Sequence, residues 1–294
     1  MNFHLLLVSL IFAFITPVFS NIPDREINVW VYAPSANATV WQSWYTSFET
    51  HQGNITGFSP CSYLMDSNGS LTYQVPDPVL ATNWSSHITQ TLGLKAYPLI
   101  AANGGGMNRA IANRTLGTLF IQATVQEALL YHYSGYNIQI EEPGNSTIEQ
   151  EWKDYLIEWL TIYQQYNLTL SIITGSICKG KDWMDMECGD YRALHANYSN
   201  LFVIPEATYE AYPPDWKEYA QDLVNGLGST VHFGMVVSKP PIMNPLNGCL
   251  PQIINSGVKS LYFWVNPPAD NDATWDGFGY FLTTENTTTT TTIV

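Results

Sequence analysis

The chain has 294 residues, of which 46% are hydrophobic and 12% are charged, and its net charge at neutral pH is −14. With only 11 Lys and Arg residues, it offers little basic surface to nucleic acid or to an anionic membrane, so we expect neither as a partner. Its length is sufficient for one large domain with a single substantial core.

The first 20 residues follow the pattern of a secretory signal peptide. An apolar run from Leu5 to Ile15 precedes smaller residues, and we expect cleavage near Ser20. A retained membrane anchor is the alternative, but the run is shorter than the roughly 20 residues that a span needs. No second span follows, so we expect a secreted, extracellular or lysosomal-lumen protein with no membrane span in its mature chain.

Two further features suit an exported protein. Nine sequons of the form Asn-x-Ser/Thr predict N-glycosylation at Asn37, Asn54, Asn68, Asn83, Asn113, Asn145, Asn167, Asn197 and Asn286. Four cysteines without CxxC or HxxxH spacing favour disulfides over a metal site. Of the three possible connectivities, we favour a short loop closed by Cys178 and Cys188, which leaves Cys61 to pair with Cys249.

Eight short apolar segments are predicted as β-strands, at residues 27–32, 55–59, 94–100, 134–143, 168–174, 201–206, 231–237 and 260–265. Helices are predicted at 39–50, 115–131, 146–166 and 216–227, and a loop that holds Cys178 and Cys188 precedes the sixth strand. Strands that alternate with helices imply parallel βαβ units, so the fold class is α/β. Eight such units predict a single closed (β/α)8 barrel over residues 21–282. The Thr-rich residues 283–294 are predicted to form a disordered tail.

The fourth predicted strand alternates polar and apolar residues. Asn137, Gln139 and Glu141 share one face, and Tyr136, Ile138 and Ile140 share the other. Because a barrel lumen is normally filled with Val, Ile and Leu, three inward polar residues need partners. One interpretation is a polar network between strands or around buried water. The other is a catalytic face on which partial burial raises the pKa of Glu141.

Polar residues also follow several other predicted strands, where the active sites of barrels lie. The candidates that we expect to converge at this end of the barrel, its mouth, are Asn103, Glu141, Glu206, Tyr209 and Asn266. The ten Trp residues suggest sugar binding, because flat aromatic faces stack on pyranose rings, although most Trp residues in a domain belong to its core. No GxGxxG or GxxxxGK[ST] motif is present, and we expect neither a cofactor nor a metal.

The eight residues from Ser134 to Glu141 resemble a motif of glycoside hydrolase family 18, which comprises chitinases and chitinase-like lectins. The family has Asp-Gly-x-Asp-x-Asp-x-Glu at strand four of a (β/α)8 barrel, where this chain reads Ser-Gly-Tyr-Asn-Ile-Gln-Ile-Glu. The family's Ser-x-Gly-Gly resembles residues 102–105, and its Met-x-Tyr-Asp resembles residues 207–210. Its strand-eight Trp resembles Trp264. The resemblance spans most of the mature chain.

The resemblance implies a role for each matching residue. Glu141 falls at the general acid that protonates the glycosidic oxygen, and Tyr209 falls where the family steadies the substrate's N-acetyl group. Trp264 would form the floor of the sugar subsite. In the family the acetamido oxygen of the substrate attacks the anomeric carbon, and the residue at the position of Gln139 orients the acetamido group. Asn103, Asn137, Glu206 and Asn266 are further candidates for contacts with an oligosaccharide or glycan substrate.

Two departures from the motif define two hypotheses. The family's Asp residues are replaced by Asn137 and Gln139, so the negative charge beside the oxazolinium ion is absent, although an amide can still hydrogen-bond the acetamido group. Another family of endo-β-N-acetylglucosaminidases places an Asn there. The first hypothesis is a chitinase or endo-β-N-acetylglucosaminidase, favoured by Glu141 and Tyr209. The second is a non-catalytic carbohydrate-binding protein, a lectin on the same barrel, favoured by the two amides.

Three other residues have alternative interpretations. Glu142 lies in Glu-Glu-Pro, which resembles the Asn-Glu-Pro of retaining β-glycosidases, but the seventh predicted strand ends without a nucleophilic Glu. Glu206 can form a pair of catalytic carboxylates with Glu141, or it can make a salt bridge or a loop contact. His232 lies on a predicted strand and is expected to be a hydrogen-bonded core histidine in preference to a base.

Overall fold

The computed structural model describes residues 25–31, 37–102, 105–140, 149–174, 186–205, 216–228, 231–236, 250–265 and 272–284. The strands are β1 (Glu26–Val31), β2 (Gly57–Met65), β3 (Leu71–Tyr73), β4 (Lys95–Ala96), β5 (Leu99–Ala102), β6 (Gly135–Ile140), β7 (Thr169–Thr174), β8 (Leu201–Pro205), β9 (His232–Val236) and β10 (Ser260–Val265). The helices are α1 (Ala38–Thr50), a short 3-10 helix at Gln52–Asn54, α2 (Pro78–Leu92), α3 (Gly106–Ala112), α4 (Arg114–Tyr131), α5 (Glu149–Gln165), α6 (Cys188–Asn197), α7 (Trp216–Leu227), α8 (Leu250–Ser256) and α9 (Asp272–Thr283). Within these ranges, every helix is too short or too polar to cross a membrane.

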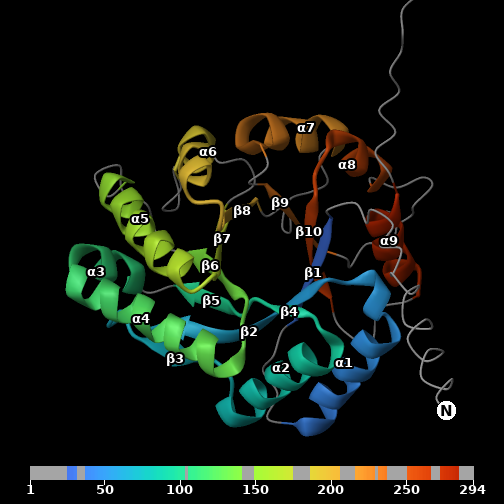
Figure 1. Cartoon of the computed structure of the whole chain (residues 1–294), viewed down its shortest axis with the longest axis horizontal. Coiled ribbons are helices and arrows are strands. Elements are labelled where there is room, and N and C mark those ends of the chain that lie inside the picture. The colour runs from blue at the N-terminus through green and yellow to red at the C-terminus, as the bar shows by residue number, and fades with distance from the viewer. Residues whose placement is uncertain are drawn as a thin grey trace, which may run out of the picture.

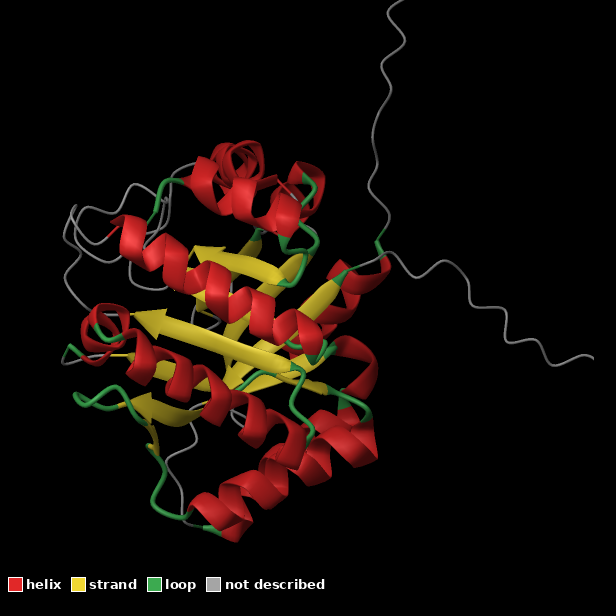
Figure 2. Ribbon diagram, turned by 60° about the vertical axis from the view of Figure 1, so that its left-hand side comes forward, coloured by secondary structure: helices red, strands yellow, loops and turns green. Residues whose placement is uncertain are grey.

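Parallel strands form a closed barrel at the centre of the molecule (Figure 1). The hydrogen-bonded order is β8-β7-β6-β5-β2-β1-β10-β9, and each pairing along this path is parallel. A parallel bridge between Val203 of β8 and Val231, the residue before β9, joins the two ends of the path. Figure 2 shows the helices outside the strands. The predicted (β/α)8 barrel is confirmed.

The second and third predicted strands differ most from the structure. β2 continues to Met65, beyond the predicted end at Ser59, because its second half pairs with β3 on one side and β5 on the other. The third predicted strand is divided into β4 and β5 on either side of Tyr97 and Pro98. Proline has no N–H to donate to a neighbouring strand, so the pairing is interrupted there.

The sequence interpretation placed no helix at five of the observed ones, namely α2, α3, α6, α8 and α9. Helix α2 begins after Asp77, whose carboxylate accepts a hydrogen bond from the backbone N–H of Leu80 at 2.9 Å, and it ends at Gly93 with a φ of 68°. This is a sequence signal for a helix, with Asp at the N-cap and a left-handed Gly at the C-cap. Helix α6 begins at Cys188, so the expectation of a loop at that residue is wrong.

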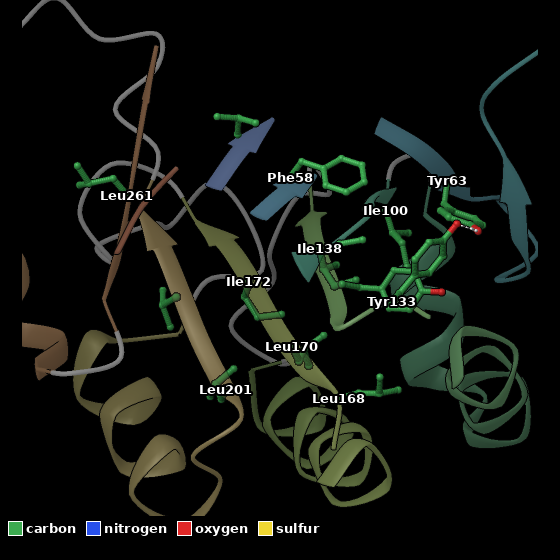
Figure 3. Packing of buried hydrophobic residues seen from close by; sticks show 14 of the residues in the cluster. Phe58, Tyr63, Ile100, Tyr133, Ile138, Leu168, Leu170, Ile172, Leu201 and Leu261 are labelled. Carbon is green, nitrogen blue, oxygen red and sulfur yellow. Dashed lines mark hydrogen bonds between the residues drawn. The ribbon is translucent and has the colours of Figure 1, made fainter. Parts of the chain in front are cut away.

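Hydrophobic residues form two clusters, one on each side of the barrel wall. The outer cluster lies between strands and helices, and Figure 3 shows Ile138, Ile172 and Leu201 among its members. The inner cluster fills the lumen and consists of Trp30, Leu99, Ile173, Ile204 and Tyr262, with Trp264 packed against it. Aromatic side chains therefore occupy lumen positions that aliphatic residues fill in most barrels of this type.

The beginning of the described chain is fixed against its last helix. Arg25 is buried, and its guanidinium lies 5.0 Å from the centre of the Phe281 ring. The same group donates hydrogen bonds to the carbonyls of Phe281, at 2.7 Å, and of Thr284. Helix α9 extends to Thr283, which was expected to be the first residue of the disordered tail. Residues 1–20 and 285–294 lie outside the described residues, so the signal peptide and the remainder of the tail stay predictions.

Candidate functional site

Strand β6 directs alternate side chains into the barrel, as its sequence predicted. Asn137 is in register with Leu99 of β5, and Gln139 is in register with Ile173 of β7. Leu99 and Ile173 belong to the lumen cluster, so this face of β6 points inward. The other face belongs to the outer cluster through Tyr136, Ile138 and Ile140.

Asn137 is part of a polar network inside the barrel. Its side chain is fully buried, and its Nδ2 donates a hydrogen bond to Ser59 Oγ on β2 at 2.8 Å. Desolvation by burial is the largest cause that raises the pKa of Tyr262 on β10 well above its ordinary value. The hydroxyl of Tyr262 therefore stays protonated. The hydrogen bond of Asn137 links β6 to β2, in line with the network interpretation, although its Oδ1 has no hydrogen-bond partner among the described residues.

Gln139 lies nearer the carboxyl end of β6, at the mouth of the barrel. It is two residues beyond Asn137, a rise of roughly 6.6 Å along a strand. Its side chain is 9% exposed, whereas that of Asn137 has no exposed surface. Strand β6 ends at Ile140, so Glu141 is the first residue after the strand.

Aromatic rings from β1 and β10 line the interior beside this face. The ring centroid of Trp30 lies 5.2 Å from that of Tyr262 and 5.3 Å from that of Trp264. Trp30 and Tyr262 are buried, and Trp264 is partly exposed. Gly234 on β9 makes room for Trp30, because a Cβ at Gly234 would lie 2.9 Å from a ring carbon of Trp30.

His232 lies deeper in the lumen, near the amino ends of the strands. It is buried between Phe202, with ring centroids 4.1 Å apart, and Tyr262, with centroids 5.7 Å apart. Burial, with the nearby charges of His195 and Lys95 as smaller causes, lowers the pKa of His232 to about 3. The imidazole is therefore neutral at physiological pH. This agrees with the expected core histidine, although its Nδ1 has no hydrogen-bond partner among the described residues.

The structure describes three of the predicted site residues: Asn137 and Gln139 share the inner face of β6, and Trp264 of β10 packs against the lumen cluster. The others lie outside the described residues, and their roles stay predictions: Asn103, Glu141, Glu206, Tyr209 and Asn266. In the described ranges, His, Cys, Asp and Glu residues form no group of three or more that could hold a metal ion.

Sequence interpretation missed three residues of the interior, Ser59, Trp30 and Tyr262. For Trp30 and Tyr262, the sequence did contain a signal that they face inward. Trp30 alternates with Val29 and Val31 on the first strand, and Tyr262 shares a face with Trp264 on the last, so period-two alternation places both inward. Ser59 carried no comparable signal, because its predicted strand ended at that residue.

Most described sequons have exposed asparagines, namely Asn37, Asn68, Asn83, Asn113, Asn167 and Asn197. Asn54 differs, because it is partly buried and its Nδ2 donates a hydrogen bond to the carbonyl of Trp275 at 2.8 Å. Asn145 and Asn286 lie outside the described residues. Cys188 is disulfide-bonded. Cys178, Cys249 and the side chain of Cys61 are not among the described groups, so the connectivity stays a prediction.

Comparison with known proteins reveals similarity in structure alone. The chain matches no protein-family model and no curated protein sequence. The spore cortex-lytic enzyme SleL of Bacillus megaterium is 11% identical, with a TM-score of 0.68 over 90% of this chain and 76% of that one.

Two chitinases are similar to the same degree. A chitinase of Chromobacterium violaceum is 10% identical with a TM-score of 0.68, over 88% of this chain and 100% of that one. A class V chitinase of Pseudomonas fluorescens is 11% identical with a TM-score of 0.67, over 88% and 99% of the two chains. The structural neighbours of this chain are therefore chitinases and spore cortex-lytic enzymes, and it has the barrel fold of these proteins.

Proposed function

We propose that this protein is a divergent member of the chitinase-like barrels of glycoside hydrolase family 18, and that it hydrolyses β-linked N-acetylglucosamine glycans. The observation that carries the proposal is the register of β6. Asn137 and Gln139 face the lumen, and Glu141 is the next residue of that alternation, immediately after the strand. A barrel whose structural neighbours include chitinases thus has a Glu at the end of the strand where that family has its acid.

In the proposed reaction Glu141 acts first as an acid and then as a base. Its carboxyl group donates a proton to the glycosidic oxygen, while the substrate's acetamido oxygen forms a bond to the anomeric carbon and the glycosidic bond breaks. Glu141 then takes a proton from water as the water oxygen attacks the anomeric carbon and the acetamido oxygen leaves. The product has the original anomeric configuration, and Glu141 is protonated again.

The remaining residues orient the sugar. In this proposal the side-chain amide of Gln139 hydrogen-bonds the acetamido group, and Tyr209 steadies the same group. Trp264 provides an apolar floor beneath the ring, and its partly exposed position beside Trp30 supports this role. The polar residues Asn103, Glu206 and Asn266 contact further hydroxyl groups. Asn137 lies deeper in the lumen and is held by its hydrogen bond to Ser59.

A second function, non-catalytic carbohydrate binding, is favoured by the two amides. An amide at residue 139 provides no negative charge for the oxazolinium ion, and a charge about 4 Å away contributes about 4 kcal/mol at an effective dielectric constant near 20. A loss of that order slows a reaction by about a thousandfold. In the lectin alternative the same residues hold the sugar, and it is not cleaved.

We further propose that the protein is exported. The signal peptide at residues 1–20, the exposed sequons and the disulfide at Cys188 support this location. Residues 21–282 form the barrel domain, and residues 283–294 form the tail, apart from the short part that α9 includes.

Turnover by the wild-type protein tests the choice between the two functions. N-acetylchitooligosaccharides and N-glycans are incubated with the protein between pH 4 and 7, and shortened products are measured by mass spectrometry. Product formation supports the hydrolase. Saturable binding of the same oligosaccharides without any product rejects the hydrolase and supports the lectin.

A further inference from the structure

A second pocket lies at the opposite end of the barrel from the candidate site. It is formed at the amino ends of β4, β6 and β7 and at the ends of α4 and α5, with Lys95, Ser134 and Thr169 among its lining residues. Its volume is about 460 Å³. Ligand sites in proteins occupy roughly 300 to 1,000 Å³, so this pocket is large enough for a small organic molecule.

Tyr97 is among the residues that line this pocket. The side chain is only 5% exposed and lines the pocket, and its hydroxyl has no hydrogen-bond partner among the described residues. Burial, assisted by the charge of Glu26, raises the pKa of Tyr97 far above its ordinary value, so the hydroxyl stays protonated. A ligand that accepts a hydrogen bond from this hydroxyl would gain the modest free energy of one such bond.

Further polar residues line the same pocket. The side chains of His132, Ser134 and Asn167 line the same pocket, and none has a hydrogen-bond partner in the ranges that the structure describes. His132 and Asn167 are also the two non-glycine residues with positive φ in these ranges, at 60° and 55°. The pocket therefore combines several uncommitted donors and acceptors in a small space.

The lining of the pocket also includes two large hydrophobic residues and one paired ammonium group. Leu129 and Tyr166 line the pocket and are 54% and 46% exposed, which is unusual for large hydrophobic residues in this protein. Lys95 forms an ion pair with Glu26, so the one ammonium group of the lining is already neutralised. A ligand with one apolar face and several hydroxyl groups fits these walls better than an anion does. A pyranose sugar has both features.

We propose that this pocket is a second carbohydrate site, which binds a neutral pyranose ring. The ring has two sources. One is a glycan on the chain itself, because Asn167, Leu168 and Thr169 form a sequon and all three residues line the pocket. The other is the end of an external oligosaccharide. The inference is independent of the proposed hydrolysis, because the two sites lie at opposite ends of the strands.

Hydrogen–deuterium exchange distinguishes the two sources. Glycosylated wild type from a eukaryotic host is compared with Asn167→Gln, and each is measured with and without millimolar N,N′-diacetylchitobiose. If the glycan on Asn167 fills the pocket, residues 128–134 and 165–170 exchange more slowly in wild type than in Asn167→Gln, and added chitobiose protects only the variant. If the source is external, added chitobiose protects these segments in both proteins.

Two substitutions connect the protection to the pocket. Tyr97→Phe removes only the hydroxyl and is expected to weaken binding about fivefold, the effect of one hydrogen bond. Leu129→Ala removes part of the apolar lining and is expected to weaken binding as well. Leu119→Ala is the matched control, because Leu119 is on the same helix, is 55% exposed and does not line the pocket.

The proposal is overturned if neither the glycan nor chitobiose protects the two segments. It is equally overturned if Tyr97→Phe and Leu129→Ala leave the protection as unchanged as Leu119→Ala does. Glu141→Gln serves as a separate control. This variant is expected to lose turnover at the other end of the barrel while the exchange of residues 128–134 and 165–170 is unaffected, so failure of one proposal leaves the other intact.

Discussion

Asn137 on β6 donates a hydrogen bond to Ser59 on β2 at 2.8 Å, although strand β5 lies between these two strands in the barrel wall. The bond therefore crosses the lumen instead of following the ladder of neighbouring strands. It explains why an amide is suited to residue 137. The Nδ2 group is a donor, and the site is fully buried, where a carboxylate would be costly.

The first prediction is that Asn137→Asp destabilises the fold. The substitution removes the donor to Ser59 and places an ionisable group in the core, so we expect a loss of about 2 to 4 kcal/mol in the free energy of unfolding at pH 7. The loss should be smaller at pH 4, where the carboxyl group is protonated more easily. Urea denaturation at both pH values measures it. Ser59→Ala, which leaves no charge, should cost about 1 kcal/mol, and equal losses for the two variants would contradict the network.

The second prediction concerns Gln139, one layer nearer the mouth. Gln139→Asp restores the carboxylate of the family motif beside the position where positive charge develops. We expect kcat to rise by about tenfold to a thousandfold, because the new charge stabilises the oxazolinium ion. Initial rates with chitooligosaccharides measure the effect, and circular dichroism checks the fold. A variant that is folded and no faster than wild type would refute the assigned position of Gln139.

The third prediction is that Gly234 is required for the packing of Trp30. A Cβ at this residue would lie 2.9 Å from the Trp30 ring and 3.1 Å from Ile204. Gly234→Ala should therefore lower the free energy of unfolding by about 1 to 3 kcal/mol and alter the near-ultraviolet circular dichroism of the Trp residues. Gly189→Ala is the control, because a Cβ at Gly189 has no neighbour within 4 Å. Similar losses in both variants would contradict the packing argument.

The fourth prediction is an acid-dependent loss of stability through His232. The pKa of His232 is lowered in the folded protein to about 3. The unfolded chain, with an ordinary pKa near 6.5, takes up the proton first as the pH falls. Stability from the neutral imidazole is therefore present above pH 6.5 and is lost as the pH falls toward 3.

His232→Phe removes this titration and keeps an aromatic ring between Phe202 and Tyr262. Between pH 7 and pH 5, wild type should lose about 2 kcal/mol more of its free energy of unfolding than the variant does. Denaturation curves at the two pH values give the difference. Parallel losses in wild type and His232→Phe would mean that His232 does not control the acid response.

The sequence predicts the barrel because the alternation of strands and helices is strong. The segments at 260–265 and 168–174 are recovered almost to the residue, since each is a continuous apolar run that a parallel sheet buries on both sides. The extension of β2 could not be foreseen in the same way. It depends on pairing with β3 and β5, which are tertiary contacts.

The site is predicted less completely than the fold. Period-two alternation correctly placed Asn137 and Gln139 on the inner face of β6. It could not distinguish Asn137, which bonds Ser59, from Gln139, which lies nearer the mouth, because alternation carries no information about depth along the lumen. The pocket at the other end of the barrel carried no signal either. Tyr97, Leu129 and Asn167 come from separate segments, and only the fold brings them together.

The assignment of Glu141 as the acid is tested most directly by comparing two neighbouring glutamates. Glu141→Gln and Glu142→Gln are assayed on the same N-acetylchitooligosaccharides and N-glycans between pH 4 and 7, each with a check of fold and of oligosaccharide binding. We predict that Glu141→Gln binds the sugar and loses about a hundredfold to ten-thousandfold in kcat, while Glu142→Gln retains activity close to that of wild type. Loss of activity in Glu142→Gln with full activity in Glu141→Gln would contradict the account.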